Sequence, residues 1–109
     1  MQPALDALAE PRRRDILALI RDRELPAGEI AANFDVTRSA ISQHVGVLKQ
    51  AGLVTERREG TRRLYRARPE GLMELRAFLD EFWSDRLDAL VREAEREERR
   101  RKRAHRRND

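Results

Sequence analysis

The sequence predicts a mainly helical α+β domain, and three observations support this fold class. Apolar residues recur at helical spacing over most of the 109 residues, one short stretch near residue 60 has hairpin character, and a long amphipathic segment follows it. A chain of this length has room for one domain with a modest core. The order of these elements is therefore the main guide to the fold.

Two helices are expected at the N-terminus. Residues 3–10 favour a short helix with Leu5 and Leu8 on one side. Pro11 suits the first turn of a second helix, which we expect to run to about residue 23. Its apolar stripe can face a core while its charged residues face water.

A pair of short helices joined by a tight turn is expected next. The first helix spans residues 29–34, after the helix breakers Pro26 and Gly28. Thr37 is a good N-cap for the second helix, and Gly52 can end it in the left-handed conformation. Between them, the apolar positions that recur at helical spacing are Ile41, Val45 and Leu48.

The C-terminal half predicts a hairpin and one long helix. Residues 53–58 and 61–68 are extended in character, with Glu59 and Gly60 between them. From residue 70 to about residue 95, large apolar side chains repeat every three or four positions. These are Leu72, Leu75, Leu79, Phe82, Trp83, Leu87 and Leu90. Residues 96–109 are almost without apolar side chains, so we expect a domain of residues 1–95 and a basic, disordered tail.

This order of elements matches a winged helix-turn-helix with a two-stranded hairpin wing and a long C-terminal dimerisation helix. In such a unit the second helix of the pair turns its polar face to the bases of the DNA major groove. The candidates on this helix are Thr37, Arg38, Ser39, Ser42, Gln43, His44 and Lys49. Arginine can pair with guanine and glutamine with adenine, whereas a merely solvated helix face is the alternative. For His44, a partly buried position near the DNA backbone is as reasonable as a base contact.

The hairpin adds Arg58, Arg62 and Arg63 as candidates, with Arg62 first among them. Arginines on a protruding wing can neutralise phosphates or enter a narrow minor groove. The alternative is an ordinary charged hairpin that resists edge-to-edge aggregation, since Glu56 and Glu59 dilute the positive charge.

The long apolar stripe predicts a homodimer. It continues for several turns beyond what so small a domain can cover, and left exposed it would exceed the apolar patch that soluble monomers usually tolerate. We therefore expect the seven residues of the stripe, with Leu5 and Leu8 beside them, to form a two-fold interface. A helix that folds back on its own domain is the alternative.

Composition excludes several classes of function. The chain has no cysteine, which rules out disulfides, thiolate metal sites and thiol redox sensing. Two scattered histidines and serines on the polar helix face form no catalytic constellation, so we expect neither an enzyme nor a cofactor. There is no signal peptide or membrane-spanning run, and we expect a soluble cytoplasmic protein. The net charge of +4 weakly favours a polyanionic partner.

Three stretches resemble the arsenic-repressor (ArsR) family of bacterial regulators. They are residues 7–17 (ALAEPRRRDIL), 39–48 (SAISQHVGVL) and 51–54 (AGLV). The resemblance spans roughly residues 4–95 and implies a dimeric protein that binds a double-stranded DNA operator, usually as a repressor. It also implies that the first and last helices form the dimer interface.

Several members of that family sense metals through a Cys-x-Cys pair before the turn, but Pro26 and Gly28 stand there in this chain. Others use histidine and carboxylate ligands on the last helix, and residues 70–95 contain no histidine. The sequence therefore resembles the non-metal branch, and it indicates no inducer. A winged helix that only binds other proteins is the rival interpretation, which the polar Ser-Gln segment flanked by Arg and Lys disfavours.

Overall fold

A computed structural model describes residues 1–108 and confirms the predicted fold class. The elements are α1 (Gln2–Ala9), α2 (Pro11–Leu19), α3 (Ala27–Ala32), α4 (Arg38–Gln50), β1 (Val54–Glu59), β2 (Arg62–Ala67) and α5 (Pro69–Asn108). Contacts divide the chain into two units, the first comprising residues 1–75 and the second beginning at Arg76.

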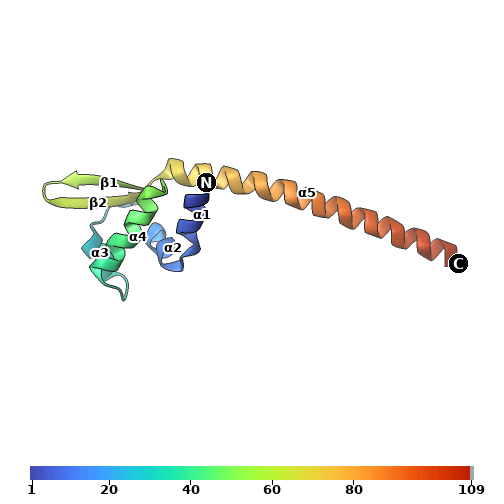
Figure 1. Ribbon diagram of the computed structural model, residues 1–109, viewed down its shortest axis with the longest axis horizontal. Coiled ribbons are helices and arrows are strands. Elements are labelled where there is room, and N and C mark those ends of the chain that lie inside the picture. The colour runs from blue at the N-terminus through green and yellow to red at the C-terminus, as the bar shows by residue number, and fades with distance from the viewer. Residues whose placement is uncertain (109) are drawn as a thin grey trace. The chain divides into compact units, whose positions relative to one another are not determined.

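The core of the first unit lies where α4 meets the other three short helices (Figure 1). Helix α4 contacts α1, α2 and α3, and its C-terminal end leads into the hairpin. The largest fully buried side chains are Ile16, Ile20, Ile30, Ile41, Leu48, Leu53 and Val45. Each contributes about 2 kcal/mol through removal of its apolar surface from water. The predicted inward face of α4 is thereby confirmed.

The sequence signals at both ends of α4 act as predicted. The hydroxyl of Thr37 accepts a hydrogen bond from the backbone N–H of Ala40 at 3.1 Å, which caps the first turn. At the other end Gly52 has a φ of 77°, and the N–H groups of Gly52 and Leu53 donate to the carbonyls of Lys49 and Leu48. This pair of bonds is a Schellman motif, which requires the left-handed backbone that glycine adopts without strain.

The start of α5 lies directly against this helix end. A Cβ atom built on Gly71 would collide with the backbone carbonyl of Gly52. The same carbonyl oxygen accepts a hydrogen bond from Nη1 of Arg68 at 3.2 Å. The close approach of these two backbone segments therefore depends on the missing side chain at position 71.

The hairpin pairs β1 with β2 in antiparallel register, with Val54 opposite Ala67 and Glu59 opposite Arg62. Gly60, with a φ of 62°, occupies the first position of the two-residue turn, where a positive φ is needed to match the twist of the strands. The sequence predicted the hairpin but not the additional segment that pairs with β2. Leu25 and Tyr65 exchange two backbone hydrogen bonds at 3.0 and 2.9 Å, so the segment before α3 pairs with β2.

Helix α5 differs from its prediction at the C-terminal end. We expected it to end near residue 95 and to be followed by a disordered tail, but the helix continues to Asn108, so the expectation of disorder is wrong for residues 96–108. The tail is rich in Arg, which has high helix propensity, as do its Glu97, Glu98 and Lys102. Ion pairs one turn apart, such as Arg99 with Glu95 and Lys102 with Glu98, add support. Asp109 lies outside the described residues.

Helix α3 begins at Ala27 instead of residue 29, because Pro26 precedes its first turn and Ala27 is buried in the core. Its start therefore lies two residues earlier than the sequence predicts. None of the helices within residues 1–108 combines the length and the apolar character needed to cross a bilayer.

Candidate nucleic-acid interface

The outward face of α4 carries polar side chains that have no partner among the described residues. Arg38, Ser39, Ser42 and Gln43 are exposed, and within residues 1–108 none of these side chains forms a hydrogen bond or an ion pair. His44 is half-buried, in keeping with its position between the two faces. The face therefore offers donors and acceptors whose hydrogen bonds are available to a ligand.

A polar groove of about 670 Å³ separates this face from the hairpin. Of the predicted site residues, the groove brings together Arg38, Ser42, Lys49, Arg62 and Arg63. Sequence reasoning did not select Gln50, Thr61 or Tyr65, which line the same groove. Their participation depends on the packing of the hairpin beside α4, for which the sequence carries no local signal.

Other predicted residues lie away from this groove. Gln43 lines a different, shallow depression beside α1, together with Pro3 and Val47. Ser39, His44 and Arg58 line neither of these two depressions. Thr37 is exposed, but its hydroxyl is already engaged as the cap of α4. The predicted residues thus do not form a single pocket.

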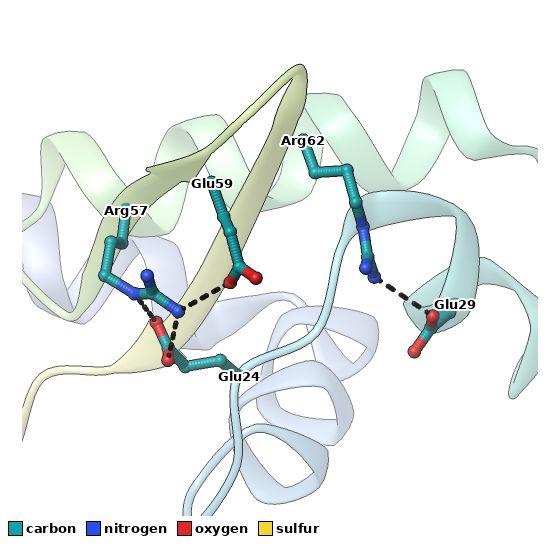
Figure 2. A network of polar contacts seen from close by, with 5 residues as sticks. All are labelled: Glu24, Glu29, Arg57, Glu59 and Arg62. Carbon is teal, nitrogen blue, oxygen red and sulfur yellow. Dashed lines mark hydrogen bonds and ion pairs between the residues drawn. The ribbon is translucent and has the colours of Figure 1, made fainter.

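Two arginines of the hairpin, Arg57 and Arg62, are held by carboxylates, as Figure 2 shows. Arg57 binds both carboxylate oxygens of Glu24, at 2.9 and 3.0 Å, and also reaches Glu59 at 3.0 Å. The hydrogen bond from Arg57 lowers the pKa of Glu24, and the two carboxylates raise the pKa of Arg57. Arg57, which pairs with two carboxylates, thereby fastens the hairpin to the segment before α3.

Arg62 is held more loosely. Its Nη2 atom lies 3.3 Å from Oε1 of Glu29 on α3, in a single contact between side chains that are 55% and 59% exposed (Figure 2). Such an exposed pair is worth about 1 kcal/mol or less. Arg62 can therefore exchange this carboxylate for another anion at little cost.

Glu56 on β1 links the helix and the hairpin. One of its oxygens lies 2.7 Å from Nζ of Lys49 on α4, and the other lies 3.8 Å from Nη1 of Arg63 on β2. The hydrogen bond from Lys49 lowers the pKa of Glu56. Lys49 and Arg63 are thus partly neutralised within the protein, whereas Arg58 forms no ion pair within residues 1–108.

The second unit exposes most of the predicted apolar stripe. Phe82, Trp83, Leu87 and Leu90 are exposed in the single chain, and Leu79 is half-buried. Phe78 and Val91 extend the same surface and were missed in the sequence, although both follow its helical spacing. From here on, the term apolar stripe denotes only the apolar residues between Phe78 and Val91 on this face of α5, and no longer the longer set predicted from the sequence.

Leu75 corrects the predicted interface. Its side chain is only 4% exposed, so it belongs to the core of the first unit and has no free surface for a partner. Leu72, Leu5 and Leu8 are half-buried in the same unit, and their part in an interface stays a prediction.

Comparison with known proteins places this arrangement among regulators of transcription. The helix-turn-helix domain family matches residues 8–57. The HTH-type transcriptional regulator Rv2034 of Mycobacterium tuberculosis is 47% identical over 81 residues, which cover 74% of this chain and 76% of that protein.

Two solved structures are similar in sequence and fold. A possible transcriptional regulator for arsenical resistance is 50% identical, with a TM-score of 0.70 over 81% of this chain and 92% of the other. The homodimeric winged helix-turn-helix DNA-binding domain Mb0332 of Mycobacterium bovis, a possible ArsR-family regulator, is 34% identical. Its TM-score is 0.63, and the match covers 76% of this chain and 77% of that one.

Proposed function

Because the chain belongs to the ArsR family of winged helix-turn-helix transcriptional regulators, we propose that it binds a pseudo-palindromic operator as a homodimer and represses transcription there. It is a DNA-binding regulator, and its relatives are regulators and not enzymes. The observation that carries the proposal is the exposed polar face of α4, whose Arg38, Ser42 and Gln43 have no partner among the described residues. Repression is supported by related repressors, among them SdpR of Bacillus subtilis.

In this proposal α4 enters the major groove and the hairpin follows the DNA backbone. Arg38, Ser42 and Gln43 contact base edges, where a guanidinium suits guanine and an amide suits adenine. Arg58 and Arg62 on the hairpin bind phosphates, which fix the position of α4 without reading sequence. Ser39, His44, Lys49 and Arg63 contribute at the edge of the contact.

Two copies are proposed because one copy leaves the apolar stripe exposed. A symmetric partner helix buries Phe82, Trp83, Leu87 and Leu90, and the related Mb0332 domain is homodimeric. A two-fold dimer presents two α4 helices to half-sites about 34 Å apart, which is one turn of the duplex. This spacing is the reason to expect a pseudo-palindromic operator.

The test uses a duplex enriched from a random pool by repeated binding to the wild-type protein. Ser42→Ala combined with Gln43→Ala should lower the ratio of affinities for this duplex and for random DNA about tenfold or more, because the variant cannot make base-edge hydrogen bonds worth about 1–3 kcal/mol. The double variant should fold normally, since both side chains are exposed and unpartnered. Fluorescence anisotropy at several salt concentrations measures both affinities.

Arg62→Ala is the comparison, because its side chain lines the same groove as Ser42 but is assigned to phosphate. It should weaken binding to both duplexes by similar factors. The salt dependence of binding should decrease by the equivalent of about one released counterion. An unchanged affinity ratio in the Ser42 and Gln43 double variant would show that α4 does not read the bases.

Glu29→Gln should raise the affinity for any duplex about threefold to fivefold at low salt. The carboxylate of Glu29 holds Arg62 at 3.3 Å and repels phosphates, so its neutralisation releases a cation for the backbone at a gain near 1 kcal/mol. The gain should shrink as salt rises, because it is electrostatic. The same anisotropy titrations measure it.

Glu74→Gln is the control for this variant, because it removes the same charge from an exposed position on α5. Equal gains in the two variants would mean that net charge matters and the contact with Arg62 does not.

A further inference from the structure

Positive charge is concentrated at the C-terminal end of α5. Residues 96–108 hold eight of the 24 Lys and Arg residues and only two acidic residues, Glu97 and Glu98. Residues 1–95 hold 16 basic and 17 acidic residues, so their net charge is close to zero. The excess positive charge of the whole chain therefore resides in residues 96–108, which we call the basic arm.

The charges of the basic arm are weakly held within the protein. Arg99, Arg100, Arg101 and Lys102 face Glu95, Glu97 and Glu98 at 3.6–3.7 Å, with basic side chains 67–79% exposed. Exposed pairs of this length contribute little and are screened by salt. Arg103 forms no ion pair among the residues whose side chains the structure describes. These five basic side chains can therefore bind external anions at little cost.

The chemistry of the basic arm selects the kind of anion. Ala104 is its one apolar residue, so the arm has no face to bury against a protein groove or to insert among lipid headgroups. It also lacks Phe, Tyr and Trp, the large aromatic side chains on which single-stranded bases stack. What remains is a helix about 20 Å long with cations on all sides, which suits the dense phosphates of a duplex.

We propose that the basic arm is a second DNA-binding surface, which binds phosphates of the duplex without reading its sequence. This inference rests on the proposed function, since it assigns the arm to the same DNA that α4 reads. The arm increases the affinity for every duplex and leaves the choice among sequences to α4. Each phosphate that it neutralises releases a condensed counterion, so its contribution appears in the salt dependence of binding.

The test replaces four cations of the arm with glutamine, which preserves helix propensity. The substitutions are Arg100→Gln, Arg101→Gln, Lys102→Gln and Arg103→Gln. In the full-length protein, affinity for a random-sequence duplex should fall at least tenfold at low salt. The slope of log K against log salt should become shallower by about 0.9 for each phosphate that the variant no longer neutralises. The ratio of affinities for the enriched and random duplexes should be unchanged.

A charge-matched control removes four exposed arginines elsewhere, namely Arg21→Gln, Arg23→Gln, Arg76→Gln and Arg92→Gln. The decrease in the logarithm of its affinity for the random duplex should be less than a third of the decrease in the arm variant. Equal decreases in the two variants would overturn the proposal, because net charge alone would then explain them. Circular dichroism and light scattering should show the same helicity and the same mass for both.

Two other results would also overturn the proposal. If the arm variant becomes monomeric, the cations pair with acidic residues of a second copy instead of DNA. If it keeps full affinity for the duplex but no longer binds phosphatidylserine vesicles, the arm serves a membrane surface. Failure of the Ser42 and Gln43 double variant to change the affinity ratio would leave these readouts intact, so the two proposals can fail separately.

Discussion

Leu87→Asp combined with Leu90→Asp should convert a dimer into a monomer and lower operator affinity at least a hundredfold. These side chains are 52% and 59% exposed in the single chain, so their replacement does not disturb the core of one protomer. In the proposed dimer each loses burial worth about 2 kcal/mol, and the two-fold axis doubles every loss. Each aspartate also brings an unpaired charge into the interface.

Light scattering at micromolar concentration measures the mass, and anisotropy with the enriched duplex measures affinity. Ala77→Asp combined with Arg92→Gln is the matched control, because it lowers the net charge by the same amount at exposed positions outside the apolar stripe. The control should remain dimeric and bind DNA normally. A wild-type protein that is monomeric at this concentration and still binds the enriched duplex tightly would contradict the dimer.

Gly71→Ala should destabilise the protein by about 3 kcal/mol, which is a change of about a hundredfold in the unfolding equilibrium. Alanine normally stabilises a helix relative to glycine by up to about 1 kcal/mol. At position 71, however, the added methyl group collides with the backbone carbonyl of Gly52, which the Schellman motif and Arg68 hold in place. The collision involves backbone on both sides, so no side chain can rotate away.

Urea unfolding at fixed protein concentration measures this destabilisation, because the stability of a dimer depends on concentration. Gly28→Ala in α3 is the control, since a Cβ atom there meets nothing within 4 Å. It should be neutral or slightly stabilising. Equal stability of the two variants would mean that α5 does not begin against the end of α4.

Most of the fold could be predicted from local signals. The cap at Thr37, the left-handed Gly52 and the apolar positions of α4 each act within one helix, and the structure confirms all three. The pairing of Leu25 with Tyr65 joins segments 40 residues apart through backbone atoms alone, so no side-chain pattern announces it. The helical basic tail is not predicted correctly, because its lack of apolar residues indicates disorder while its Glu, Arg and Lys residues favour a helix.

The candidate site was predictable in its position but not in its internal contacts. The polar face of α4 follows from helical periodicity, whereas the partners of the hairpin arginines do not. Arg57 and Arg62 meet Glu24 and Glu29 across 33 residues of sequence, and only the packed hairpin brings them together. Leu75 was misplaced for a related reason, because a periodic stripe does not tell which residues its own domain covers.

The shared carboxylate of Glu56 affects how mutational data on this surface should be interpreted. Lys49 and Arg63 approach different oxygens of the same group, so replacing either cation changes the electrostatic environment of the other. Substitutions at neighbouring charges of this kind are not additive in free energy. The loss of binding free energy on removal of Lys49 therefore cannot be assigned to a DNA contact alone. Part of this loss arises because the carboxylate of Glu56 keeps only Arg63 as a partner. A double-mutant cycle through Glu56 separates the two contributions.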